Sequence, residues 1–328
     1  MRAAVQTAYG GPEVIVIRDV PKPVPGAGEV LVRVIATTVT SGDARLRAFR
    51  VPPAFWLPAR LALGIRKPRK TVLGSEFAGE VVAVGSGVKR LRTGDRVFGM
   101  HLYDAHAEYK VVPESAAIVS IPSNLDFAEA AALPFGALTA RFFIQRAGLQ
   151  PGQRVLVNGA SGAVGTRSVQ LAKQAGAWVT AVTSTRNIEL VRSLGADEVI
   201  DYQAADFSLT EQPYDVVMDT VGTVSWARFC RASTPTGQLL AIDGGGAMFL
   251  RAAWRRWIGR RRVVVGMATE KLEDIEIIRG LAESGALRAT IDRRFPLADI
   301  AEAHALVDSG RKRGAVVIDV AEPQPVSE

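Results

Sequence analysis

A glycine-rich turn between an apolar strand and an amphipathic helix, within residues 154–187, constrains the fold of this chain more than any other stretch. Val155, Leu156 and Val157 form a short apolar run, which is typical of a strand buried on both faces. The turn at 160–165 follows, a helix is predicted from there to Gly176, and residues 178–183 predict a second strand. This order predicts a doubly wound parallel sheet.

The turn has the pattern of a dinucleotide fingerprint, with alanine in the first glycine position. Its second glycine would let the backbone approach a pyrophosphate, and its third would let the helix pack closely on the sheet. The free amides and positive dipole end of the helix suit a phosphate. We predict a dinucleotide contact by Gly159, Ala160, Ser161, Gly162, Ala163, Val164 and Gly165. The alternative is a turn of the same fold that binds no nucleotide.

The end of the second strand bears on which nucleotide is bound. NAD sites usually place an acidic residue there to accept from the ribose hydroxyls. Residues 183–187 read Thr-Ser-Thr-Arg-Asn instead, and hydroxyls with a guanidinium suit a 2′-phosphate. We therefore predict NADPH rather than NADH. The alternative for Arg186 is a solvated residue of the next helix.

Strands and helices alternate from residue 150 onward, which predicts one parallel sheet. Its expected strands are 154–157, 178–183, 198–200, 215–219, 238–242 and 262–266. Upstream, residues 2–6, 13–19 and 29–35 are predicted as short strands, separated by a segment rich in proline and glycine. This part predicts a mostly antiparallel, barrel-like domain.

Composition limits the other classes of function. With 328 residues, of which 48% are hydrophobic, the chain can form two domains, and its single cysteine excludes an intrachain disulfide. We find neither a signal peptide nor a run of about 18 apolar residues, so we predict a cytoplasmic protein without stable membrane insertion. The net charge is +7, but arginines concentrated at 251–262 supply much of it and no nucleic-acid module is recognisable, so no nucleic-acid partner is expected.

Residues 49–70 break the regular pattern, because Pro52, Pro53 and Pro58 interrupt a run of aromatic and aliphatic residues. We predict an irregular apolar flap. It either forms the wall of a pocket for an apolar substrate or is a packed loop.

Six motifs occur in an order that is specific as a set. They are GSEFAGEVVAVG at 74–85, GDRVFG at 94–99, EYKVVPE at 108–114, ALPFGALTA at 132–140, NGASGAVG at 158–165 and SLGADEVIDY at 193–202. Together they resemble the medium-chain dehydrogenase/reductase superfamily, and within it the zinc-independent quinone oxidoreductase branch. The resemblance implies a GroES-like catalytic domain at 1–122 and 287–328, and a Rossmann NADP-binding domain at 123–286.

The resemblance also bears on metal chemistry. Zinc-using relatives carry their ligands at positions that correspond to about Thr40, Ser75 and Phe135 of this chain. None of these residues is a usual zinc ligand, so no metal is expected. Quinones and activated enones accept hydride at carbon without a Lewis acid, and the site then supplies position, a hydrogen bond and a proton.

Family positions assign further cofactor residues. Thr139 should approach the nicotinamide carboxamide, and Val164 should lie behind the pyrophosphate. Ser184, Arg186 and Tyr202 should surround the 2′-phosphate. Two more strand ends, at the carboxyl edge where such sheets bind ligands, contribute Val221, Gly222, Gly244 and Gly245. The alternative for each glycine is an ordinary turn.

On the substrate side, Thr40 and Ser41 offer hydroxyls to a developing oxyanion, and Tyr103 or His106 could deliver a proton. Asp43 would assist there, or only orient a neighbour or cap a turn. A structural function is the alternative for His106.

Residues 247–262 predict a basic amphipathic helix that covers the substrate entrance, touches a membrane or is simply solvated. The family resemblance implies a homodimer through the strand at 262–266, and residues 321–328 are expected to be disordered. Three functions stay open: an NADPH-dependent reductase of small apolar quinones or enones, a metal-free alcohol dehydrogenase or carbonyl reductase, and a non-catalytic NADPH-binding protein.

Overall fold

The computed structural model describes residues 1–243, 248, 252 and 260–321, and the chain forms two compact units. The first unit is Met1–Phe135 with Glu270–Glu328, and the second is Gly136–Thr269. The predicted domain boundaries after 122 and before 287 differ from these limits. Helices α3 (Phe127–Ala131) and α9 (Leu272–Glu283) explain the difference, because both pack on strands of the first unit.

The second unit contains a six-stranded parallel sheet, with the strand order β10-β9-β8-β11-β12-β13. Its strands are β8 (Arg154–Asn158), β9 (Trp178–Thr183), β10 (Glu198–Asp201), β11 (Tyr214–Asp219), β12 (Ser233–Ala241) and β13 (Arg262–Val264). All six predicted strands are present, although β12 begins earlier and β13 ends earlier than expected. The order, in which β8 lies at the centre and the chain proceeds outward in both directions, confirms the doubly wound fold.

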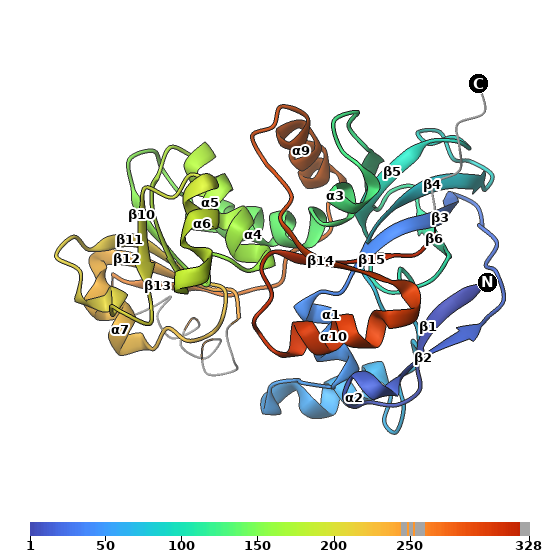
Figure 1. Cartoon of the computed structure of the whole chain (residues 1–328), viewed down its shortest axis with the longest axis horizontal. Coiled ribbons are helices and arrows are strands. Elements are labelled where there is room, and N and C mark those ends of the chain that lie inside the picture. The colour runs from blue at the N-terminus through green and yellow to red at the C-terminus, as the bar shows by residue number, and fades with distance from the viewer. Residues whose placement is uncertain (244–247, 249–251, 253–259, 322–328) are drawn as a thin grey trace. The chain divides into compact units, whose positions relative to one another are not determined.

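Helices cover both faces of this sheet (Figure 1). On one face are α4 (Pro134–Ala147), α5 (Ala163–Gln174) and α6 (Ile188–Ser193), which contribute Phe143, Val169 and Val191 to a buried cluster. On the other are α7 (Trp226–Ala232) and the 3-10 helix Phe207–Leu209. The strands are therefore buried on both sides, as the apolar run at 155–157 predicts.

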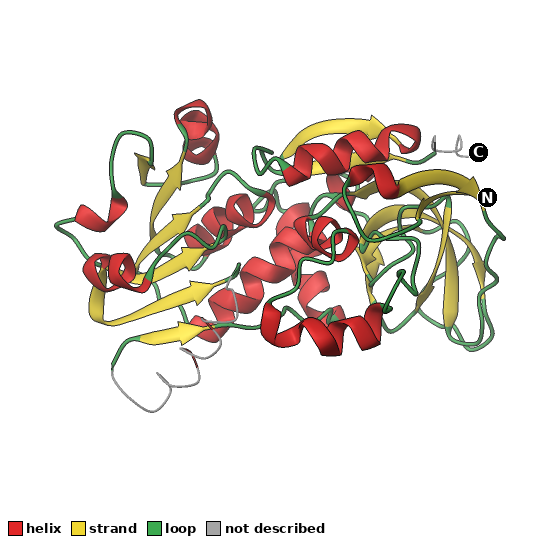
Figure 2. Cartoon of the chain, turned by 90° about the horizontal axis from the view of Figure 1, so that it is seen from below, coloured by secondary structure: helices red, strands yellow, loops and turns green. Residues whose placement is uncertain are grey.

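The first unit contains a seven-stranded sheet, with the order β14-β15-β3-β4-β5-β7 and with β6 paired to β3. Its strands are β3 (Glu29–Thr38), β4 (Glu76–Val84), β5 (Arg96–Met100), β6 (Tyr109–Pro113), β7 (Ala117–Ser120), β14 (Ile291–Pro296) and β15 (Ala315–Asp319). All of these pairs are antiparallel except β14 with β15. A separate antiparallel pair consists of β1 (Arg2–Gln6) and β2 (Ile15–Asp19). The strands are the yellow arrows of Figure 2.

Helix α1 (Ser41–Arg47) follows β3 after a short link, and α10 (Ile300–Asp308) packs against it (Figure 1). The segment predicted as an irregular flap contains a 3-10 turn, Pro53–Phe55, and a helix, α2 (Trp56–Leu63). The prediction of irregular structure is wrong here. Pro58 lies in the first turn of α2, where a missing amide hydrogen costs no intrahelical bond, so it does not break the helix.

Some predictions fall on residues that the structure does not describe. Gly244, Gly245, most of the predicted helix at 247–262 and the tail from 322 lie outside the described ranges. Among the helices that are described, none combines the length and the apolar character needed to cross a membrane.

Candidate active site

The glycine turn after β8 has two glycines that packing requires. Gly159 has a φ of +77°, and an added Cβ would lie 2.6 Å from Thr220 Oγ1. A Cβ on Gly165 would lie 2.1 Å from the Gly159 carbonyl oxygen, as expected for close helix–strand packing. Gly162, the N-cap of α5, differs, because the nearest atom to an added Cβ is 3.5 Å away. The protein itself does not require glycine at 162, which fits a position that a ligand approaches.

A buried polar network joins the ends of β8 and β11. Asn158 Nδ2 donates to Asp219 Oδ1 at 2.9 Å. The Asp219 carboxylate also accepts from the backbone amides of Gly222 at 3.1 Å and Val224 at 2.8 Å. The network fixes the loop that contains Val221 and Gly222, and Val221 is 47% exposed. The predicted cofactor residues Val221 and Gly222 therefore lie beside the glycine turn, because the preceding Thr220 packs closely against Gly159.

The end of β9 is tied to the same turn. Asn187 Nδ2 donates to Ser184 Oγ at 3.2 Å and to Ser161 Oγ at 3.1 Å. Ser184 and the glycine turn are therefore adjacent, as the nucleotide-site prediction requires. Arg186 is exposed on the 3-10 turn Thr185–Asn187, and Tyr202, just after β10, is 60% exposed.

Asp201, at the end of β10, adds a carboxylate that the sequence analysis did not consider. It accepts from the Thr185 hydroxyl and from the Gln203 amide. The Thr185 hydrogen bond lowers the pKa of Asp201 below its usual value. The Thr185 hydroxyl holds the Asp201 carboxylate in place. The surface next to the exposed Arg186 therefore also carries a fixed negative charge.

Thr139 lies on α4, one turn after Gly136. A Cβ on Gly136 would lie 2.4 Å from the Ala163 carbonyl oxygen, so the start of α4 passes close to the start of α5. Thr139 is half-buried there. Of the predicted cofactor residues, the structure thus brings together the turn 159–165, Ser184, Val221, Gly222 and the helix that carries Thr139.

In the first unit, the predicted catalytic residues Thr40 and Asp43 form a capping box at the start of α1. The Thr40 hydroxyl donates to Asp43 Oδ2 at 2.6 Å, and the Asp43 amide donates back to Thr40 Oγ1 at 3.1 Å. Asp43 is buried and also accepts from the Gly74 amide at 3.1 Å. The hydroxyl proton of Thr40 is directed at Asp43, so in this arrangement Ser41, which is half-buried, is the more available hydroxyl.

Two buried histidines pack edge to face behind α1, with ring centroids 5.7 Å apart. His106 Nε2 lies 2.9 Å from the Thr38 carbonyl oxygen, which only accepts, so this nitrogen carries the proton. Burial lowers the pKa of His106, and it lowers that of His304 to about 2. Both rings are therefore neutral near pH 7. His106 has its Nε2 proton committed to the backbone, which favours the structural alternative.

Tyr103 lies on a strained loop. Tyr103 and Asp104 both have a φ of +66°, which is uncommon for residues other than glycine. Tyr103 lines a cavity of about 120 Å³ together with Tyr9, Leu63, Arg69 and Lys70. Burial raises the pKa of its phenol, so the hydroxyl keeps its proton at neutral pH.

Lys110 holds this loop, and the sequence analysis missed it. The side chain is buried, and Nζ donates to the carbonyl oxygens of His101, at 2.5 Å, and Tyr103. Burial lowers the pKa of the Lys110 ammonium to about 7. Strand alternation contained the signal, because Lys110 shares a face of β6 with the buried Val112.

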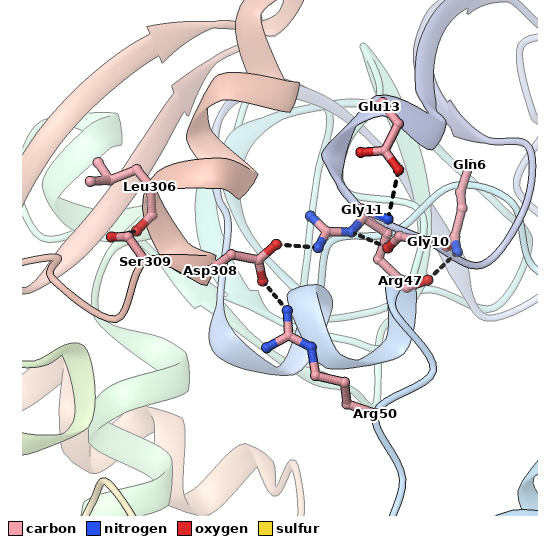
Figure 3. Close-up of polar contacts among 9 residues, drawn as sticks. All are labelled: Gln6, Gly10, Gly11, Glu13, Arg47, Arg50, Leu306, Asp308 and Ser309. Carbon is pink, nitrogen blue, oxygen red and sulfur yellow. Dashed lines mark hydrogen bonds and ion pairs between the residues drawn. The ribbon is translucent and has the colours of Figure 1, made fainter.

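A second buried cation, Arg47, anchors the C-terminal end of α1 (Figure 3). Arg47 is fully buried, donates to the Gly10 carbonyl oxygen at 3.1 Å and forms an ion pair with Asp308 of α10. Arg50 pairs with the second oxygen of Asp308, and Gln6 donates to the Arg47 carbonyl at 2.9 Å. The cluster joins the N-terminal segment, α1 and α10.

The residues that the family resemblance aligns with zinc ligands are not usual zinc-binding side chains. The Thr40 hydroxyl is used in the capping box, Ser75 offers only another hydroxyl and Phe135 offers no donor. In the part of the chain that the structure describes, no group of three His, Cys, Asp or Glu side chains could hold a metal ion.

Comparison with known proteins identifies the family of this chain. Two family models match, an alcohol dehydrogenase GroES-like domain over residues 26–123 and a zinc-binding dehydrogenase over 194–318. The quinone-oxidoreductase QR1, chloroplastic, of Triphysaria versicolor is 32% identical over 97% of this chain and 98% of its own length. The chain belongs to the medium-chain dehydrogenase/reductase superfamily, in its quinone oxidoreductase branch.

Other members of the superfamily give the same result. This medium-chain dehydrogenase/reductase is 31% identical to an NADPH-dependent alkenal/one oxidoreductase, chloroplastic, of Arabidopsis thaliana, over 97% of this chain and 79% of that protein. The structure of the quinone oxidoreductase from Coxiella burnetii matches with a TM-score of 0.85 and 28% identity, over 98% of this chain and 99% of that one. The GroES-like and Rossmann domains are confirmed, and the chain is an oxidoreductase enzyme of the pyridine-nucleotide type.

Proposed function

We propose that this enzyme is a zinc-independent, NADPH-dependent reductase of small apolar quinones or activated enones. The observation that carries the proposal is the cluster at the end of β9, where Asn187 joins Ser184 to Ser161 of the glycine turn, with the Arg186 guanidinium on the adjacent turn. This is the arrangement expected for a nucleotide whose ribose carries a phosphate.

The named relatives support the choice of acceptor. They include a quinone oxidoreductase and an alkenal/one oxidoreductase described as NADPH-dependent. Bound NADPH would supply a hydride to an electron-poor carbon of the acceptor, which takes one proton to give the hydroquinone or the saturated ketone. The donor set at Thr40, Ser75 and Phe135 supports chemistry without zinc.

The chain's own part in the reaction is to hold a proton donor near the acceptor oxygen. Tyr103 fits this function, because its phenol stays protonated at neutral pH and lines a cavity. Ser41, at the start of α1, is the second candidate donor of a hydrogen bond to the developing oxyanion. Thr40 and Asp43 would act by holding the start of α1 in place.

The test follows oxidation of NADPH and of NADH at the nicotinamide absorbance, with a water-soluble benzoquinone, a conjugated enone and a simple ketone, each with and without a chelator. We expect turnover of NADPH with the quinone or the enone that the chelator does not change. Turnover of the ketone alone would instead identify a carbonyl reductase or alcohol dehydrogenase. Binding of NADPH without any turnover would identify a non-catalytic binding protein.

We also propose a homodimer through the edge of the second unit's sheet. Among the described strands, β13 pairs only with β12, so one of its edges is open to a second copy. Light scattering after gel filtration should give twice the chain mass of 35.0 kDa. A monomer at micromolar concentration would contradict this.

A further inference from the structure

Helix α2 is apolar and exposed at the same time. Its sequence is WLPARLAL, yet none of the residues that the structure describes in it is buried. Trp56, Leu57 and Leu61 are 48%, 62% and 55% exposed, and the flanking Phe55 and Ile65 are 47% and 64% exposed. We call residues 55–70 the α2 surface. Exposed apolar side chains that gather on one surface element and are bordered by polar residues mark interaction sites.

The exposure is a fixed property of the fold, because the opposite side of α2 is anchored. The Arg60 guanidinium lies 3.9 Å from the ring centroid of Phe49, and Arg60 Nη1 donates to the Ile65 carbonyl at 3.0 Å. The Tyr9 hydroxyl donates to the Leu63 carbonyl at 2.9 Å. These contacts use one side of the helix, and Leu57 and Leu61, one turn apart, remain outward.

The sequence around α2 carries only positive charge. Residues 44–75 contain no acidic residue, and they include Arg45, Arg47, Arg50, Arg60, Arg66, Lys67, Arg69 and Lys70. The four that follow α2, from Arg66 to Lys70, are exposed. Two acidic residues from elsewhere in the chain contact these cations: Asp308 pairs with Arg47 and Arg50, and Asp104 lies 4.0 Å from Lys70, with both of these last side chains largely exposed. A partner of this surface must accept apolar side chains and carry negative charge.

We propose that the α2 surface binds the face of an anionic lipid bilayer. Leu57, Leu61 and the two aromatic residues would enter the boundary between headgroups and acyl chains, and Arg66, Lys67, Arg69 and Lys70 would contact anionic headgroups. A second copy of this chain fits less well, because a two-fold contact through this surface would bring together two copies of a segment that has cations and no acidic residue. The proposal concerns peripheral binding and goes beyond the reductase function.

The segment also contributes to the cavity that Tyr103 lines, through Leu63, Arg69 and Lys70. Binding of the α2 surface to a bilayer would therefore bring this cavity close to the lipid. Lipid binding itself does not depend on turnover, so it is measured separately from activity.

The test is sedimentation of the full chain with sucrose-loaded vesicles of phosphatidylcholine alone, or with a third of phosphatidylglycerol. We expect binding to the anionic vesicles, at least tenfold weaker binding to the neutral ones, and loss of binding as salt is raised. The double variant Leu57→Ser, Leu61→Ser and the double variant Arg66→Glu, Lys67→Glu should each lower binding at least tenfold. Their melting temperatures check that these exposed changes leave the fold intact.

Two matched controls change the same chemistry elsewhere. Trp178→Ser alters an exposed apolar residue of the second unit, and Lys89→Glu with Arg92→Glu reverses two exposed cations of the first unit. Both should bind anionic vesicles like the parent chain. Equal losses in controls and α2 variants, or no binding to anionic vesicles, would overturn the proposal. Self-association that the α2 variants abolish would overturn it in favour of a second copy.

Discussion

The carboxyl edge of the second unit's sheet and the region around α1 in the first unit hold their geometry by different means. At the sheet edge, backbone segments fix the geometry, namely a glycine turn, strand ends and a loop hydrogen-bonded to Asp219. Around α1, buried charged side chains fix the geometry, namely Asp43, Arg47 and Lys110. The first kind of site is sensitive to added atoms, and the second to the loss of a charge partner. Four predictions test this difference, beginning with the largest.

Asp308→Ala should destabilise the protein most. It would leave the fully buried Arg47 without its carboxylate, which costs about 3–5 kcal/mol of unfolding free energy in comparable buried pairs. The measurement is urea unfolding. Asp319→Ala is the matched control, because the Asp319–Arg294 pair is also an arginine–carboxylate contact but is exposed, and its loss should cost less than about 1 kcal/mol. Similar costs for the two variants would contradict the comparison.

Lys110 should make stability depend on pH. Its pKa falls from an unfolded value of 10.5 to about 7 in the folded chain, so between these values the unfolded state binds more protons. The cost of burying the charge is therefore fully present below pH 7 and is relieved as pH rises. The unfolding free energy of the parent minus that of Lys110→Met should increase by about 2 kcal/mol from pH 7 to pH 9. A difference that stays constant with pH would show that burial does not lower the pKa of Lys110.

Substitutions at two glycines of the turn, Gly165 and Gly162, should separate effects on packing from effects on nucleotide binding. Gly165→Ala places a methyl group 2.1 Å from a carbonyl oxygen and should cost about 1–3 kcal/mol of unfolding free energy. Gly162→Ala meets no protein atom closer than 3.5 Å, so its stability should change by less than about 0.5 kcal/mol. Its affinity for NADPH, measured by calorimetry, should nevertheless fall on the order of tenfold. Unchanged affinity would mean that no ligand approaches Gly162.

Arg186→Ala should have the smallest and most selective effect. Loss of one guanidinium from a phosphate site should weaken NADPH on the order of tenfold, while NADH binding changes little. Arg192→Ala is the control, because Arg192 is an exposed arginine of the neighbouring α6 that pairs with Glu189. Equal losses for both nucleotides would refute the 2′-phosphate assignment.

The fold was largely predictable because its signals are local. The run at 155–157, the glycine turn and the alternation of strands and helices each depend on neighbouring residues, and they specified the sheet of the second unit correctly. The helix α2 was not predicted, since its proline suggests a break unless the helix start is known. The boundaries at Phe135 and Glu270 also depend on tertiary packing, which sequence periodicity does not contain.

The candidate site was predictable only where backbone groups determine its geometry. The residues predicted to contact the cofactor lie near one another at the turn, whereas Lys110 and the Arg47–Asp308 pair were not predicted. The partners in that pair lie 261 positions apart in the chain, so no local pattern links them. Thr40 and Asp43 were predicted as catalytic residues, and the structure adds that they form a capping box in which the Thr40 hydroxyl donates to Asp43.

The network around Asp219 has a kinetic consequence. It holds the loop from Thr220 to Val224 in one conformation with side chains and amides of the protein alone. Ordering a residue costs about 1–2 kcal/mol of backbone entropy, and for this loop folding has already met that cost. Encounter with a nucleotide then requires no ordering of this loop, so the loop itself should add no slow conformational step to nucleotide association.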